Sequence, residues 1–229
     1  PEQAVRAGLA KARNNGRGAY DAFRDRVIIP IEDTRGRVVA FGGRVMPGGS
    51  SDAPKYINSP ETPVYKKSSV LYGLRHARTG IQRSGRLLVV EGYFDVISLH
   101  QAGFLEAVAT CGTALTPEHA RTVRPLTRTV IALFDSDAAG ERAAARSMEV
   151  FLANGIEPKR LTLDGAKDPD EYVQDKGAEA FEAALQRAEP LFELLLRRAM
   201  ERHGTSPGGR AAVLSELAPI VRQFPPEAR

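Results

Sequence analysis

From residue 86 onward, short apolar runs of strand length alternate with segments that carry helix start and stop signals. The apolar runs lie at residues 87–90, 107–110, 129–134 and 160–163. The helical segments lie at residues 94–102, from 117 onward and 138–154. A β-α-β-α-β-α-β order is typical of α/β domains in which helices cover both faces of a sheet. The pattern therefore predicts a doubly wound, mostly parallel sheet for this part of the chain.

Single residues mark these boundaries. Thr116 is a typical N-cap, and Pro117 suits the first position of the helix that follows it. Gly103 and Gly155 stand where two helices are expected to end. The run TVIALF at residues 129–134 is apolar and partly β-branched. Such a run favours a strand that is buried on both faces.

The two ends of the chain have other patterns. Residues 1–19 predict a short helix or tail, and residues 27–32 and 38–45 predict a β-hairpin that is followed by a loop containing the short strand KYIN. After residue 170 the pattern is only helical, and we expect helices near residues 170–187, 190–202 and 208–223. We therefore expect a mixed α+β basic subdomain, a catalytic α/β domain and a small helical segment. Their predicted ranges are residues 1–79, 80–188 and 189–229.

Composition excludes several classes of protein. Cys111 is the single cysteine, so an internal disulfide is excluded, and with only four scattered histidines we expect no zinc site. A reducing compartment, the cytoplasm, fits this usage. No run approaches the about 20 apolar residues that a membrane span needs. The chain begins at Pro1 without a methionine, which suggests a fragment of a longer protein.

Charge is unevenly distributed along the chain. Residues 1–86 hold 16 Lys and Arg against 7 Asp and Glu, whereas residues 87–229 hold 16 against 21. A basic half attracts polyanions, and clustered acids hold divalent cations. Two ordinary solvated faces would give the same totals, so charge alone leaves both interpretations open.

Acidic residues follow three of the predicted strands. They are Glu91 and Asp95 after the first strand, Asp135 and Asp137 after the third, and Asp168 and Asp170 after the fourth. The carboxyl ends of parallel strands form the crevice in which open α/β sheets bind ligands. Crowded carboxylates repel one another unless a cation neutralises them, and Mg²⁺ takes carboxylate oxygens. A helix N-cap or a simple turn would explain each motif singly, but the three together predict a site for divalent cations.

These motifs resemble those of the Toprim domain, which occurs in bacterial primases, in topoisomerases and in some nucleases. The segment VVEGYFDV at residues 89–96 resembles its glutamate motif, FDSDAAG at residues 134–140 its DxD motif, and DPD at residues 168–170 its last acidic motif. The resemblance implies a Toprim-like fold. It also implies that Glu91, Asp135 and Asp137 are catalytic and hold Mg²⁺ or Mn²⁺, with Asp95, Asp168 and Asp170 completing the metal shell.

Segments outside these motifs are similar to the bacterial replicative DNA primases. They lie at residues 20–31, 36–44, 54–62, 71–74 and 112–116, so the resemblance covers residues 16–175. It implies that Arg44, Lys55 and Lys67 contact the template or the incoming nucleotide and that Asn58 lies near the nucleotide. Tyr56 and Phe41 suit either base stacking or the core, and we expect Lys66 to face solvent. Ser136 differs from the family, which usually has glycine between the two aspartates.

The resemblance implies a DNA-templated enzyme that makes short RNA primers from ribonucleoside triphosphates by two-metal nucleotidyl transfer. Its implied partners are single-stranded DNA, the RNA–DNA product and a replicative helicase, which would bind a domain outside this chain. We expect a monomer without membrane association. Two rivals remain at this point: another Toprim enzyme, such as a nuclease or topoisomerase, and a template-binding fragment that is inactive on its own.

Overall fold

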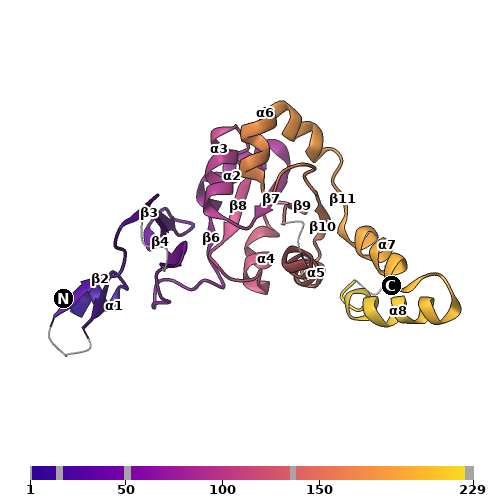
Figure 1. Ribbon diagram of the computed structural model, residues 1–229, viewed down its shortest axis with the longest axis horizontal. Coiled ribbons are helices and arrows are strands. Elements are labelled where there is room, and N and C mark those ends of the chain that lie inside the picture. Colours follow the sequence, from indigo (N-terminus) through magenta and orange to yellow (C-terminus); the bar gives the residue numbers. More distant parts are fainter. Residues whose placement is uncertain (1, 14–17, 49–52, 135–137, 225–229) are drawn as a thin grey trace.

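The computed structural model describes residues 2–13, 18–48, 53–134 and 138–224. Figure 1 shows small sheets near the N-terminus, a larger sheet flanked by helices in the middle, and two helices near the C-terminus. The elements are α1 (Glu2–Arg6), β1 (Ala10–Ala12), β2 (Ala19–Asp21), β3 (Arg26–Glu32), β4 (Val38–Val45), β5 (Tyr56–Asn58), β6 (Leu71–Tyr72), α2 (Leu74–Ser84), β7 (Arg86–Val90), α3 (Tyr93–Gln101), β8 (Ala107–Thr110), α4 (Pro117–Val123), β9 (Thr129–Ala132), α5 (Ala138–Leu152), β10 (Glu157–Arg160), α6 (Pro169–Leu185), β11 (Glu189–Pro190), α7 (Leu191–His203) and α8 (Pro207–Val221).

The larger sheet has six strands in the order β11-β10-β9-β7-β8-β6. The four inner strands pair in parallel, and the two edge strands β6 and β11 pair antiparallel to their neighbours. Strand β7 lies between β8 and β9, so the chain leaves β7 to one side and returns on the other. The predicted mostly parallel sheet is confirmed. Its two edge strands come from outside residues 80–188.

Helices cover both faces of this sheet, because side chains alternate along each strand. Leu88 and Val90 of β7 pack in a buried cluster with residues of α3 and α6. Leu87 and Val89 point to the other face, where a second buried cluster includes residues of α2, α4 and α5. The predicted doubly wound arrangement is therefore confirmed.

The N-terminal part holds a two-stranded sheet, β1-β2, and a three-stranded antiparallel sheet, β3-β4-β5. The predicted hairpin is present, and its turn is held by the Asp33 side chain, which accepts hydrogen bonds from the backbone N–H groups of Arg35 and Arg37. Gly36 in this turn has φ +81°, a conformation that favours glycine. Within the part expected to be a short helix or tail, residues 10–12 form a strand, because they pair with residues 19–21.

The C-terminal helices α7 and α8 pack on each other and on α5. Met148 of α5, Leu194 of α7 and Leu217 of α8 belong to one buried cluster. Their bounds lie within two residues of the helices expected from the sequence. Among the described helices, none is both long enough and apolar enough to cross a membrane.

One strand lies three residues earlier than expected. The run at residues 160–163 was predicted as a strand, but β10 spans Glu157–Arg160 and pairs in register with β9. Strand β9 ends at Ala132, and after Arg160 one more hydrogen bond joins the two segments, from Leu161 N to Ala132 O. Leu161 and Leu163 then pack against the α3 and α6 cluster as the chain leaves the sheet.

Candidate active site

Glu91 and Asp95 occupy the turn between β7 and α3. Glu91 directly follows the last residue of β7 and is exposed. Asp95 lies in the first turn of α3 and is buried, and its Oδ2 accepts a hydrogen bond of 3.0 Å from Gly92 N. A Cβ atom at position 92 would lie 2.8 Å from this same oxygen. Glycine at position 92 therefore lets the carboxylate reach the backbone.

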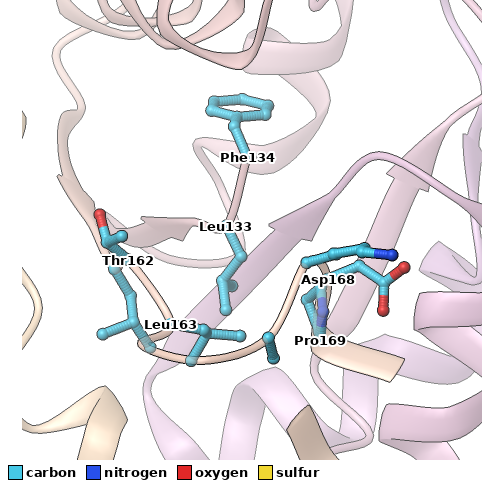
Figure 2. Close-up of a pocket in the computed structure, with 9 residues that line it drawn as sticks. Leu133, Phe134, Thr162, Leu163, Asp168 and Pro169 are labelled. Carbon is cyan, nitrogen blue, oxygen red and sulfur yellow. The ribbon is translucent and has the colours of Figure 1, made fainter. Parts of the chain in front are cut away.

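Asp168 and Asp170 begin α6, which lies beside α3 (Figure 1). Asp168 is the N-cap, and its Oδ1 accepts a hydrogen bond of 2.8 Å from Glu171 N. The carboxylate of Asp170 accepts hydrogen bonds from Ser98 of α3 and from Gln174 one turn further along α6. Leu133 and Phe134, which follow β9, line one pocket with the loop that leads to Asp168, and Figure 2 shows Leu133 pointing toward that loop.

These carboxylates are close enough to alter one another's protonation. The pKa of Asp95 is raised to about 7, first by burial and then by the charge of Asp168, with a smaller contribution from Asp170. The backbone N–H groups of Gly92 and Asp170 act in the opposite direction. A buried carboxylate beside two others favours either a proton or a cation. Oxygen ligands of this kind fit Mg²⁺ or Mn²⁺.

The structure brings only part of the predicted acidic set together. Asp95 lies near enough to Asp168 and Asp170 for their charges to raise its pKa, and Glu91 lies four residues before Asp95 at the end of the central strand. Asp135, Ser136 and Asp137 lie outside the described residues, after the end of the neighbouring strand β9. Within the described residues alone, no three His, Cys, Asp or Glu side chains form a group that would hold a metal ion.

Arg44 and Tyr56 face this acidic group from the three-stranded sheet. The Cζ atom of Arg44 lies 4.3 Å from the ring centroid of Phe94, next in sequence to Asp95, and 5.8 Å from that of Tyr56. Tyr56 is 39% exposed, which excludes the core role that the sequence left open. Its pKa is raised, mainly by burial and also by the charges of Asp95, Asp170 and Asp168, against the effect of Arg44. The sheet β3-β4-β5, which we call the basic sheet, therefore shares one site with the acidic group of Asp95, Asp168 and Asp170.

Asn58 links the three-stranded sheet to the larger sheet. Its Oδ1 accepts a hydrogen bond of 2.9 Å from the hydroxyl of Tyr93, and its Nδ2 donates one of 3.0 Å to the carbonyl oxygen of Cys111. A Cβ atom at Gly112 would lie 2.7 Å from Nδ2. The amide expected near the nucleotide thus also connects β5 with α3 and with the loop after β8.

The predicted lysines differ in exposure. Lys55 is exposed, and its Nζ lies 5.8 Å from the ring centroid of Tyr56. Lys66 is exposed, as expected, whereas Lys67 is half-buried. The backbone of Lys67 is held by Glu61, whose Oε1 accepts from its N–H, and by His119, whose Nε2 lies 3.0 Å from its carbonyl oxygen. His119 therefore has the structural role of a satisfied polar group.

Several residues that support the acidic group were not identified from the sequence. Ser98 is three residues after Asp95 on α3, and Gln174 is four residues after Asp170 on α6. Residues three and four apart share one face of a helix, so this spacing would have indicated both. Tyr93 carries no comparable signal, because its partner Asn58 lies 35 positions away along the chain.

Comparison with known families supports this geometry. The model for the DNA primase catalytic core, N-terminal domain, matches residues 1–78. The Toprim-like model matches residues 88–173, the part that contains Glu91 and the acidic start of α6.

Individual relatives agree with the family models. The DNA primase of Escherichia coli strain K12 is 41% identical over 227 residues, which are 97% of this chain and 38% of the relative. A crystal structure of a DNA primase domain from Pseudomonas aeruginosa is 41% identical with a TM-score of 0.89, over 98% of this chain and 70% of that one. A DnaG primase catalytic domain bound to single-stranded DNA is 40% identical with a TM-score of 0.87, also over 98% and 70%. This chain thus spans less than half of the curated E. coli relative.

Proposed function

Because the chain belongs to the family of bacterial DNA primase catalytic cores, we propose that it is the part of a primase that joins ribonucleotides on a single-stranded DNA template. The observation that carries the proposal is that acidic and basic side chains lie close together at one edge of the larger sheet. Asp95, Asp168 and Asp170 stand on one side, and Arg44 and Lys55 of the basic sheet stand on the other.

The reaction has needs that these groups meet. In nucleotidyl transfer the 3′-oxygen of one nucleotide attacks the α-phosphorus of the next. A new P–O bond forms, the bond from that phosphorus to the bridging oxygen breaks, pyrophosphate leaves with the electron pair, and the hydroxyl proton passes to water. Divalent cations, when bound, stabilise the negative charge on the attacking oxygen and on the leaving oxygen. Glu91, Asp135 and Asp137 would hold them, with Asp95, Asp168 and Asp170 completing the shell.

The basic residues bind and orient the substrates. Arg44, Lys55 and Lys67 neutralise phosphate charge on the template or the incoming ribonucleoside triphosphate. The exposed ring of Tyr56 offers a stacking surface for a base, since every base has a π-face. Asn58 joins β5 to α3, because its Oδ1 accepts a hydrogen bond from the hydroxyl of Tyr93. We place the nucleotide near this amide.

The proposal extends to the setting of the reaction. The chain acts in the cytoplasm as a monomer with Mg²⁺, for which Mn²⁺ can substitute, and without zinc in this segment. The helicase binds through a domain outside it. Residues 1–79 form the basic subdomain, residues 80–188 the catalytic domain and residues 189–229 the helical segment.

Primer synthesis on single-stranded DNA with ribonucleoside triphosphates and Mg²⁺ tests the proposal. Glu91→Gln and Asp135→Asn should each lower synthesis at least about 1,000-fold, because each removes a metal-binding charge, while the thermal unfolding temperature stays within a few degrees. End-labelled DNA with metal and no nucleotides is the second arm. Cleavage there, without primer synthesis by the unmodified chain, would identify a Toprim nuclease instead.

A further inference from the structure

A cleft lies beside Glu91, and Asp95, Asp168 and Asp170 are not among its wall residues. It has a volume of about 390 Å³ and lies at the carboxyl ends of β8, β7 and β9. Its walls include Thr113 from the loop after β8, Phe134 after β9 and Arg146 from α5. This volume is within the about 300–1,000 Å³ that small-molecule sites usually have. The strand order also reverses at β7, since the next strand along the chain, β8, lies on one side of it and β9 lies on the other. Open α/β sheets bind ligands at such a topological switch point.

Arg146 brings a positive charge to the wall of this cleft. It is exposed, and among the described residues no carboxylate or other side chain forms an ion pair or hydrogen bond with it. Its guanidinium carries five N–H donors in a fork that matches phosphate oxygens. The hydroxyls of Thr110 and Thr113 add donors to the same walls. A guanidinium and two hydroxyls in the walls of one cleft can donate hydrogen bonds to phosphate oxygens.

The proposed function restricts which phosphate groups can lie here. The proposed function assigns the template and the nucleoside to Arg44, Lys55 and Tyr56, which belong to β4, β5 and the segment between them. A triphosphate whose α-phosphorus lies near Glu91 can extend its β- and γ-phosphates along the sheet edge, away from Arg44 and Lys55. The cleft beside Arg146 shares Glu91 as a wall residue and lies at that edge.

We propose that the cleft between the loop after β8 and α5 binds the β- and γ-phosphates of the incoming ribonucleoside triphosphate, and the pyrophosphate that they become, through Arg146 and Thr113. The inference rests on the proposed function, because it assigns a subsite to the same reaction. It makes Arg146 a residue that holds the leaving group.

Equilibrium binding of inorganic pyrophosphate with Mg²⁺ to the whole chain tests this directly. Arg146→Ala should weaken binding about tenfold, because a charge-assisted hydrogen bond is lost at an exposed site. Arg146→Lys, which keeps the charge without the fork, should lose about threefold, and Thr113→Val, which removes one hydroxyl, about threefold. In primer synthesis, the KM for the ribonucleotide and the inhibition constant of pyrophosphate should rise together in Arg146→Ala.

Arg142→Ala is the matched control, because Arg142 is an exposed arginine one turn earlier on the same helix and is not a wall residue of the cleft. Its pyrophosphate affinity should stay within twofold of the unmodified chain. An equal loss of pyrophosphate affinity in Arg142→Ala would overturn the proposal, since the ligand would then be attracted by the overall positive charge of α5 and not by Arg146 in the cleft. Unchanged pyrophosphate binding in Arg146→Ala, with weaker binding of single-stranded DNA or of an annealed primer, would instead assign the cleft to nucleic acid.

The binding measurement also separates this inference from the proposed function. Pyrophosphate binding needs no template and no primer synthesis. A chain that makes no primers but shows the Arg146-dependent binding supports the subsite and removes the proposed activity. A chain that makes primers with unchanged constants in Arg146→Ala keeps the activity and overturns the subsite.

Discussion

The six-stranded sheet and the β3-β4-β5 sheet hold opposite charges, and they hold them in different ways. The larger sheet has helices on both faces, and Leu88 and Val89 of its central strand are at most 1% exposed. The smaller sheet leaves Val27 42% and Ile28 43% exposed. Its buried residues share one cluster with Tyr93 and Cys111 of the larger part. The smaller sheet therefore depends on its neighbour for much of its core.

This difference matters for the site. The acidic residues follow strands that are fixed by their own core, and Asp95, Asp168 and Asp170 are held further by hydrogen bonds. The basic residues reach the site only when the smaller sheet is docked. We infer that the acidic side is the fixed half of the site and that the basic side is positioned against it.

Truncation of one apolar strand residue in each sheet should have very different costs in the free energy of unfolding. Leu88→Ala removes a fully buried side chain and should lower the free energy of unfolding by about 2–5 kcal/mol. Ile28→Ala removes a half-exposed side chain and should cost less than about 1 kcal/mol. Denaturant unfolding measures both. Equal costs would contradict the comparison, since the smaller sheet would then have a core of similar weight.

The acidic side should also reveal itself through pH. In the metal-free chain Asp95 has a pKa of about 7 against an ordinary value of 3.8, so the folded state binds the proton more tightly than the unfolded state. This contribution is complete below about pH 4 and is lost as pH rises toward 7. The pKa shift limits the contribution of this proton to the free energy of unfolding to about 4 kcal/mol, and we expect a contribution of about 2 kcal/mol.

Asp95→Asn is the control for this pH dependence. It keeps the shape of the side chain and cannot ionise, so stability between pH 4 and 7 should fall less steeply than in the unmodified chain. Added Mg²⁺ should reduce the difference between the two at pH 7, because a cation offsets the same repulsion. Identical pH profiles for the two chains would show that Asp95 is not the titrating group.

The sequence predicted the fixed half of the molecule better than the docked half. Alternating apolar runs and helix signals such as Thr116 and Gly155 placed most strands and helices, because each signal is local. The position of β10 was wrong, because pairing with β9, and not hydrophobicity, decides where that strand ends. Leu161 is buried in either case, so its apolar character could not distinguish a strand from the segment that follows it.

The site shows the same division. The acids were predicted to lie at one edge because each group of them comes after a predicted strand, either directly or in the loop or turn that follows it. The contact of Asn58 with Tyr93 and the position of Arg44 over Phe94 depend on how two sheets dock, and no local pattern encodes that. The cleft beside Arg146 was missed for a similar reason, since its walls come from three separate segments.

Docking can be weakened through one hydroxyl. Tyr93→Phe removes the hydrogen bond to Asn58 Oδ1 and leaves that oxygen without its donor, at a cost of about 1 kcal/mol. Amide hydrogen exchange should become faster in β4 and β5 and stay unchanged in β7 and β9. Tyr72→Phe is the matched control, because Tyr72 packs 4.8 Å from the ring of Tyr93 and its hydroxyl donates to no described residue. Equal exchange in both variants would show that the hydroxyl does not hold the sheet.

The smallest effect concerns single cations of the docked half. Arg44 lies over the Phe94 ring beside the acidic group, whereas Lys66 is exposed on the segment that follows β5. Arg44→Ala should weaken binding of a labelled single-stranded oligonucleotide about threefold to fivefold, alike for every sequence. It should also reduce the slope of log affinity against log salt by about 0.7, the value for one phosphate contact on a single strand.

Lys66→Ala removes the same charge from the same half and should change neither quantity. Titrations at several salt concentrations separate the two cases. If Lys66→Ala lost as much affinity as Arg44→Ala, DNA would be held by the diffuse charge of the basic half, and docking would not determine which cations bind it.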